Sequence, residues 1–135
     1  MSAASSSRTI TIEVSPAELL DKISILEIKA ERIADPAKLK NVRAQLRALC
    51  EVRDRRVAAS DELAKLQAEL KTVNEALWDI EDEIRLCEAN RDFGTRFVEL
   101  ARAVYRNNDR RAGLKRSIDL LLGSAILEEK SYTRY

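Results

Sequence analysis

The chain has 135 residues, of which 35% are charged, and it contains only three glycines and two prolines. This length is sufficient for one domain, and such a composition is typical of long helices with few loops. No run approaches the ~18 apolar residues of a membrane span, and the first residues lack the charged-then-apolar pattern of a signal peptide. We therefore expect a cytoplasmic protein without a membrane span.

The net charge is +1, but the charges come in blocks of alternating sign. Residues 1–37 carry −2, residues 38–59 carry +5, residues 60–92 carry −6 and residues 93–135 carry +4. Such blocks are suited to pairing with one another, whereas nucleic acid attracts a continuous basic field. The arginines between residues 43 and 56 spread around a helix without forming one stripe, so we do not expect nucleic-acid binding.

The absence of histidine excludes several common catalytic sites. Ser–His and Cys–His nucleophiles, the HExxH zinc site and the histidine ligands of di-iron bundles all require it. Cys50 and Cys87 lie in helical patterns without metal-ligand spacing, so we expect reduced thiols. The carboxylates of residues 79–83 point to different sides of a helix, so we expect neither a metal nor a cofactor.

Residues 1–14 are predicted to form a flexible tail that includes a short extended segment. The first eight residues are small and polar, whereas residues 9–14 alternate as a β-strand does. No second strand candidate exists in the chain. We therefore expect the extended segment either to pack on a helix or to be half of an intermolecular pair.

Two cap-and-proline pairs predict helix starts. Ser15 precedes Pro16 and stands three residues before Glu18, which is the composition of an N-terminal capping box. Asp35 before Pro36 repeats the arrangement after a short connection. The second helix must therefore fold back antiparallel to the first, which predicts a helical hairpin.

The clearest pattern is a heptad seam from Leu63 to Cys87, in which apolar residues alternate by three and four. Residues 37–91 contain neither glycine nor proline, and local propensity favours one helix of about 80 Å. An arginine-rich lapse in the apolar pattern leaves open a break near Ser60. We predict an all-α fold, with antiparallel helical hairpins around a long coiled-coil-like central helix, or a four-helix bundle if that helix breaks near residue 60.

A last helix is predicted after a turn at residues 92–95, with Thr95 as its cap and Gly123 just beyond its end. The helical domain is then residues 15–123, and residues 124–135 form a C-terminal tail. The last helix is basic and the heptad segment is acidic, so we expect the two to pack antiparallel.

A polar patch interrupts the apolar stripe of this last helix. Residues 107 and 111 stand at seam positions but are asparagine and arginine. Burying such groups unpaired costs about 1–3 kcal/mol each, so they either form a polar layer, face a wet pocket or lie off the interface. A ligand or anion site would bring them together with polar residues of the first helix. The residues of that candidate site are Asp21, Lys22, Asn107, Asn108, Asp109, Arg111 and Lys115.

Large aromatic side chains are common interface anchors, and we assign Trp78, Tyr105 and Tyr132 as candidate interface residues. The apolar stripes must be covered by one another or by a twin chain. We expect a homodimer, an interaction with another protein, or both.

Four stretches of the chain, SPAELLDKISILEIKAERI (15–33), DPAKLKNVRAQL (35–46), VNEALWDIEDEIR (73–85) and FVELARAVYRNNDRRAGLKRSIDLLLGSAILEEKSY (97–132), carry a resemblance to a known family. They resemble an uncharacterised bacterial family of short all-helical proteins, the domain of unknown function numbered 6165. The family also occurs attached to larger proteins with tetratricopeptide or glycosyltransferase regions. The resemblance implies a module accessory to surface-glycan biosynthesis and supplies no catalytic residues.

Two functions follow from these observations. The first is a non-catalytic helical interaction or scaffold module, supported by the seam, the charge blocks and the lack of catalytic motifs. The alternative is a small all-helical enzyme or an anion or small-molecule binder that uses the Asn/Asp/Arg/Lys cluster. A concave pocket lined by those side chains favours the second function, whereas a closed polar layer favours the first.

Overall fold

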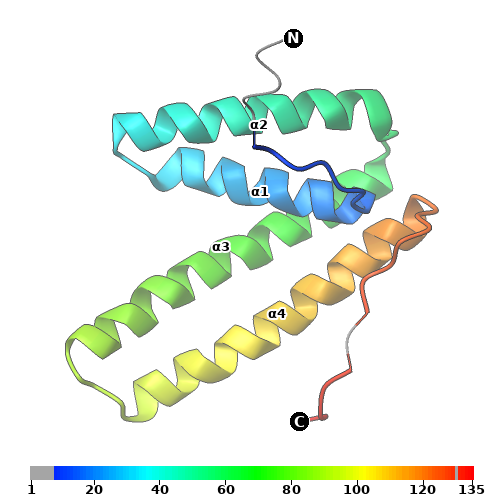
Figure 1. Cartoon of the computed structure of the whole chain (residues 1–135). Coiled ribbons are helices and arrows are strands. Elements are labelled where there is room, and N and C mark those ends of the chain that lie inside the picture. Colours follow the sequence, from blue (N-terminus) through cyan, green and yellow to red (C-terminus); the bar gives the residue numbers. More distant parts are fainter. Residues whose placement is uncertain (1–7, 130) are drawn as a thin grey trace.

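A computed structural model describes residues 8–129 and 131–135 of the chain. These residues form four helices, α1 (Pro16–Arg32), α2 (Pro36–Arg56), α3 (Asp61–Ala89) and α4 (Thr95–Leu121), and contain no strand. The helices make two antiparallel hairpins, α1–α2 and α3–α4, which cross each other (Figure 1). The all-α prediction is confirmed, whereas most of the predicted N-terminal tail, residues 1–7, lies outside the described residues.

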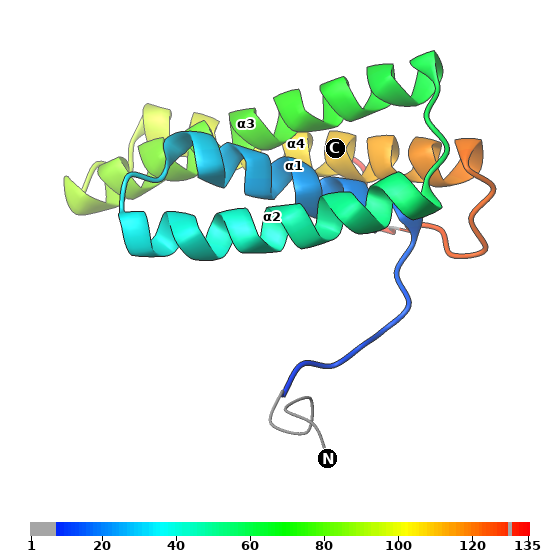
Figure 2. The same ribbon diagram turned by 90° about the horizontal axis from the view of Figure 1, so that it is seen from above.

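Helix α1 is the centre of the fold. It contacts each of the other three helices, whereas α2 contacts α1 alone. Seen from above, α1 lies between α2 and the α3–α4 pair (Figure 2). The apolar side chains of Ala17, Leu20, Ile23 and Ile28 are almost completely buried because every side of the helix except a narrow strip meets a neighbour. The predicted N-cap of α1 forms, because the Ser15 hydroxyl accepts a hydrogen bond from the Glu18 N–H at 3.2 Å.

The long segment after α1 is broken into two helices near residue 60. Helix α2 ends at Arg56, and α3 begins at Asp61 with the Ser60 hydroxyl accepting a hydrogen bond from the Leu63 N–H at 3.1 Å. Of the two predicted alternatives, the structure therefore has the break. Local propensity for continuity was overridden by packing, because the break lets half-buried Leu46 and its neighbours on α2 reach the common core.

The heptad seam runs along α3 and points into the protein. Leu63, Leu70, Val73 and Cys87 are buried, and the other four seam residues are half-buried. Helix α3 packs antiparallel to α4, as the opposite charges of the two segments predicted, and Glu83 forms an ion pair with Arg96. The seam is thus confirmed as the core-facing side of a helix.

Of the two turns that flank α4, the one after the helix agrees with the prediction and the one before it does not. Gly123 follows the helix with φ of 67°, and the Ser124 N–H donates to the Asp119 carbonyl at 2.9 Å, which is the predicted C-terminal motif. The cap predicted at Thr95 is wrong by one position, because Thr95 is already helical and Gly94 stands at the cap without a side chain to accept a hydrogen bond.

The described part of the N-terminal segment, residues 8–14, is extended but does not lie on a helix. Ile10 and Ile12 are 85% and 73% exposed, and the segment runs away from the helices (Figure 2). The prediction that it packs on a helix is therefore wrong, because the apolar surface of α1 is already covered by the other three helices. The alternative, an intermolecular pair, stays a prediction.

The C-terminal tail runs back along α4 (Figure 1). A guanidinium nitrogen of Arg116 donates to the Glu128 carbonyl at 3.0 Å, and Arg116 also pairs with the Glu129 carboxylate. At the end of the tail, the Tyr135 ring meets Tyr105 edge-on with 5.0 Å between ring centroids. The tail is thus held to α4 at Glu128 and Glu129 and again at Tyr135.

Candidate functional site

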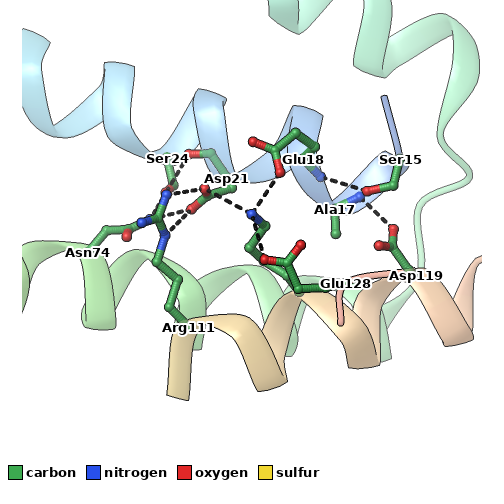
Figure 3. A network of polar contacts seen from close by, with 10 residues as sticks. Ser15, Ala17, Glu18, Asp21, Ser24, Asn74, Arg111, Asp119 and Glu128 are labelled. Carbon is green, nitrogen blue, oxygen red and sulfur yellow. Dashed lines mark hydrogen bonds and ion pairs between the residues drawn. The ribbon is translucent and has the colours of Figure 1, made fainter. Parts of the chain in front are cut away.

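A buried carboxylate, that of Asp21 on α1, is the centre of a polar cluster between α1, α3 and α4 (Figure 3). Its side chain is 1% exposed. Arg111 of α4 holds both carboxylate oxygens, with Nε donating to Oδ1 at 3.1 Å and a terminal nitrogen donating to Oδ2. From α3, the Asn74 amide donates to Oδ1 at 2.9 Å. One side chain therefore ties three helices together.

The remaining polar groups around Asp21 complete the layer. The Asn74 amide nitrogen also donates to the Ser24 hydroxyl at 2.6 Å. That hydroxyl in turn donates to the Asp21 backbone carbonyl at 3.0 Å. Because buried polar groups are costly when unpaired, this set of mutual hydrogen bonds is what allows the three polar residues to stand in a helix interface.

A buried ammonium group lies one turn further along α4. The Lys115 side chain is 8% exposed, and its Nζ is 2.7 Å from a Glu18 carboxylate oxygen. The same nitrogen is 3.7 Å from Asp21 Oδ2 and 3.6 Å from a carboxylate oxygen of Glu128 in the C-terminal tail. Lys115 therefore joins α1 and the tail to α4.

The charges of this cluster are stabilised by one another. Burial raises the pKa of Asp21, but the hydrogen bonds from Arg111 and Asn74 outweigh it, so that the pKa lies below 3.8. The hydrogen bond with Asp21 raises the pKa of Arg111. Burial lowers the pKa of Lys115, yet the neighbouring carboxylates, first that of Glu18, leave it above 10.5. All three groups are ionised at neutral pH, so none of them is tuned to exchange a proton there.

A second buried carboxylate, that of Asp119 on α4, holds the beginning of α1 (Figure 3). Its Oδ1 accepts a hydrogen bond from the Ala17 N–H at 2.9 Å. Its Oδ2 is buried and has no hydrogen-bond partner among the described residues. A negative charge at the N-terminus of a helix is favourable, so Asp119 acts as a cap supplied from another helix.

Only three of the seven residues predicted for a ligand site come together, namely Asp21, Arg111 and Lys115. Lys22 is exposed and takes no part in the cluster. The Asn107 amide donates to the Ala103 carbonyl of its own helix at 2.8 Å. The expected convergence of the whole set is not observed, because the first helix crosses α4 beyond the turn that carries residues 107–109.

Asn108 and Asp109 lie on the side of α4 that faces the tail. They line a hollow of ≈ 780 Å³ together with Tyr105, Tyr132 and Tyr135. The hydrogen bond with Asp109 raises the pKa of the Tyr135 phenol. Asn108 and Asp109 therefore face the docked tail and are separate from the buried cluster.

Several members of the cluster were not found by sequence reasoning. They are Glu18, Ser24, Asn74, Asp119 and Glu128. One signal existed in the sequence of α1, because residues 17, 21, 24 and 28 follow helical spacing along one side and two of them are polar. Such a mixed stripe predicts a polar helix interface.

The three candidate interface aromatics have different surroundings. Trp78 is half-buried, and the Arg32 guanidinium lies 6.0 Å from the centre of its ring. Trp78 lines an open groove of ≈ 370 Å³ between α1 and α3, and Arg111 of α4 is another of its lining residues. Tyr105 is partly covered by the tail, whereas Tyr132 is largely exposed.

Within residues 8–129 and 131–135, no group of three or more acidic or cysteine side chains is arranged to hold a metal ion. Both cysteines are free thiols. None of the helices in the described part of the chain is both long and apolar enough to cross a bilayer.

Comparison with protein families agrees with the resemblance seen in the sequence. The model of a family of unknown function (DUF6165) matches residues 10–135. The chain belongs to this family. Searches of curated proteins and of solved structures found no match. Since the family has no assigned activity, the function has to be inferred from the geometry of this chain.

Proposed function

We propose that the protein is a non-catalytic helical interaction or scaffold module that associates with a second copy of itself, with another protein, or with both. The observation that supports this proposal is the closure of the polar cluster. Asp21, Asn74 and Lys115 are all buried, and each reaches partners on another helix. A ligand site needs polar groups that are free to meet a ligand, whereas these groups are used in joining helices.

Apolar side chains at the surface supply the contacts that such a module needs. Near the α3–α4 turn, Leu86, Phe93 and Val98 are each more than half exposed. The N-terminal segment 8–14 runs away from the helices (Figure 2), and its Ile10 and Ile12 side chains are largely exposed. Grouped exposed apolar side chains are a mark of protein–protein contact surfaces.

The proposal includes a cytoplasmic location and a role accessory to surface-glycan biosynthesis proteins. Both rest on the sequence and on what its resemblance to the family implies. Neither requires a cofactor or a metal ion, and no catalytic residue is assigned.

The test removes the charges of Asp21 and Arg111 and leaves the ion pair between Lys115 and Glu18 in place. The double variant Asp21→Asn, Arg111→Gln retains hydrogen-bonding groups at both positions. If the cluster only holds the helices, the variant that remains helical by circular dichroism associates with the same dissociation constant as the wild type, within about threefold. The control is Glu81→Gln, Arg85→Gln, which removes an exposed ion pair at 3.3 Å. A helical double variant that no longer associates would overturn the assignment of the cluster as a closed structural layer, and a wild type that does not associate would overturn the interaction module.

The second candidate function, anion or small-molecule binding, is favoured by one observation. Arg111 and Asn74 are among the residues that line the open groove beside Trp78. Two acidic residues at its rim, Glu81 and Asp82, oppose an anion there. A rise in melting temperature with inorganic phosphate that is lost in Arg111→Gln would support this candidate, whereas our proposal predicts no shift.

A further inference from the structure

The extended residues 8–14, which we name the arm, have two chemically different sides. In an extended chain alternate side chains point in opposite directions, so residues 8, 10, 12 and 14 share one side and residues 9, 11 and 13 share the other. The first side carries Ile10, Ile12 and Val14, which are 85%, 73% and 42% exposed. The second carries two threonines and a glutamate. This is the pattern of a strand with one apolar side.

The arm has the residues of a strand but no strand beside it. Five of its seven residues are isoleucine, valine or threonine, which favour β-structure. The described residues contain no strand, and the arm runs clear of the helices (Figure 2). Residues 8–129 and 131–135 therefore offer the arm no strand partner within the chain.

We propose that the arms of two copies of this chain pair as antiparallel strands. This inference rests on the proposed function, because it names a second copy as the partner and the arm as the contact. A second copy fits because the arm is complementary to itself: antiparallel pairing places isoleucine opposite isoleucine and threonine opposite threonine or glutamate. The resulting two-stranded ribbon has one side with four isoleucines and one polar side.

The register follows from the alternation. Opposite residues in a sheet share a side, so only registers that keep the apolar residues together are allowed. Among these, the register centred on Thr11 pairs the arm over its whole length, with Ile10 of each copy opposite Ile12 of the other. Registers centred on residue 10 or residue 12 leave two residues of each arm unpaired. Thr11 therefore lies opposite Thr11 of the second copy.

The first test replaces the apolar side of the arm. Ile10→Thr with Ile12→Thr keeps β-branched side chains but removes the apolar surface of both residues, and each dimer loses four isoleucines. Because the two Ile10–Ile12 pairs contact each other across the ribbon and no element covers them, we expect the dimer dissociation constant to rise roughly tenfold. The matched control, Thr9→Ser with Thr11→Ser on the polar side, is expected to change it by less than about fivefold. Because the arm lies outside the helical core, the melting temperature stays within about 2 °C of the wild type in both variants.

The second test probes the register with cysteines in the full chain, after Cys50→Ser and Cys87→Ala remove the native thiols. Opposite residues of antiparallel strands have Cα atoms about 4.5–5.5 Å apart, which a disulfide can span. Mild oxidation is therefore expected to link Thr11→Cys into a covalent dimer. In Thr9→Cys the two cysteines stand about 13 Å apart, and no link is expected.

The outcomes separate this inference from the proposed function. A wild-type dimer that persists unchanged in Ile10→Thr, Ile12→Thr overturns the arm pairing and leaves the interaction module standing. Equal cross-linking at positions 9 and 11 overturns the register and with it the paired arms. A wild type that is monomeric at all concentrations overturns both the arm pairing and the homodimer.

Discussion

Asparagine in place of Asp21 removes the charge at the centre of the polar cluster and replaces Oδ2, which accepts from Arg111, with an N–H donor. The amide keeps the size of the carboxylate and an acceptor for the Asn74 donor, which is 2.9 Å from Oδ1. Arg111, 29% exposed, loses its ion-pair partner among the described residues, whereas Lys115 keeps Glu18 at 2.7 Å. Removing one partner of a buried ion pair costs about 3–5 kcal/mol. Because Arg111 retains some water and Lys115 retains a carboxylate, we expect about 3 kcal/mol.

The free energy of unfolding is measured by urea denaturation, followed through the helical circular dichroism signal. Glu81→Gln is the control, since it removes an exposed partner of Arg85 and is expected to cost less than about 0.5 kcal/mol. If Asp21→Asn costs less than about 1 kcal/mol, then Asp21 does not hold the three helices together, and the account of the cluster is refuted.

The same pair of proteins tests the charge of Asp21 through pH. Its pKa is lowered in the folded protein from an ordinary value of 3.8. Its contribution is therefore complete above pH 3.8 and is lost as the pH falls through the lower folded value. The difference in unfolding free energy between wild type and Asp21→Asn should be constant near neutrality and shrink below pH 3.8. A difference that stays constant down to pH 2, about two units lower, would contradict the ion pair.

Three further substitutions test the ends of the helices, each by urea denaturation. Asp119→Ala leaves the Ala17 N–H without its buried acceptor at 2.9 Å and should destabilise by about 1–3 kcal/mol; an unchanged midpoint would show that α4 does not cap α1. Ser60→Ala removes the cap of α3 and should cost about 1 kcal/mol, whereas no loss would place the start of α3 elsewhere. Arg91→Gly relieves a left-handed backbone with φ of 54° and should be neutral or stabilise by up to about 1 kcal/mol; a clear loss would contradict that geometry.

The parts of the fold that the sequence predicted well depend on neighbouring residues. Ser15 before Pro16 and Asp35 before Pro36 mark helix starts through local hydrogen bonds, and both caps form. The break near Ser60 was left open because the apolar pattern lapses in the arginine-rich segment, although local propensity favoured one continuous helix. Packing of α2 against the core decides it, and that packing depends on residues far away in the sequence.

The cluster could be predicted only where it interrupts a pattern. Arg111 drew attention because it stands where the heptad calls for an apolar residue. Asn74 gave no such signal, since it lies beside the seam residue Val73, and its partner Asp21 is 53 residues away. That contact exists only because one hairpin crosses the other at a particular angle. Periodicity within a single helix carries no information on that crossing.

The surroundings of the arm could not be predicted from its sequence pattern either. Its alternation is plain in the sequence and predicts an extended chain. Its surroundings were predicted wrongly, because the apolar surface on which it was expected to lie is filled by other helices. This is why we propose that the apolar side of the arm contacts a second copy of the chain.

Association in solution is the central claim, and sedimentation equilibrium of the wild-type chain tests it most directly. The measurement covers concentrations from about 1 µM to about 300 µM, because the mass of a weak dimer depends on concentration. We predict an average mass that rises from the 15.3 kDa of one chain toward twice that value. A mass that stays at 15.3 kDa over the whole range would contradict the homodimer and the arm pairing together.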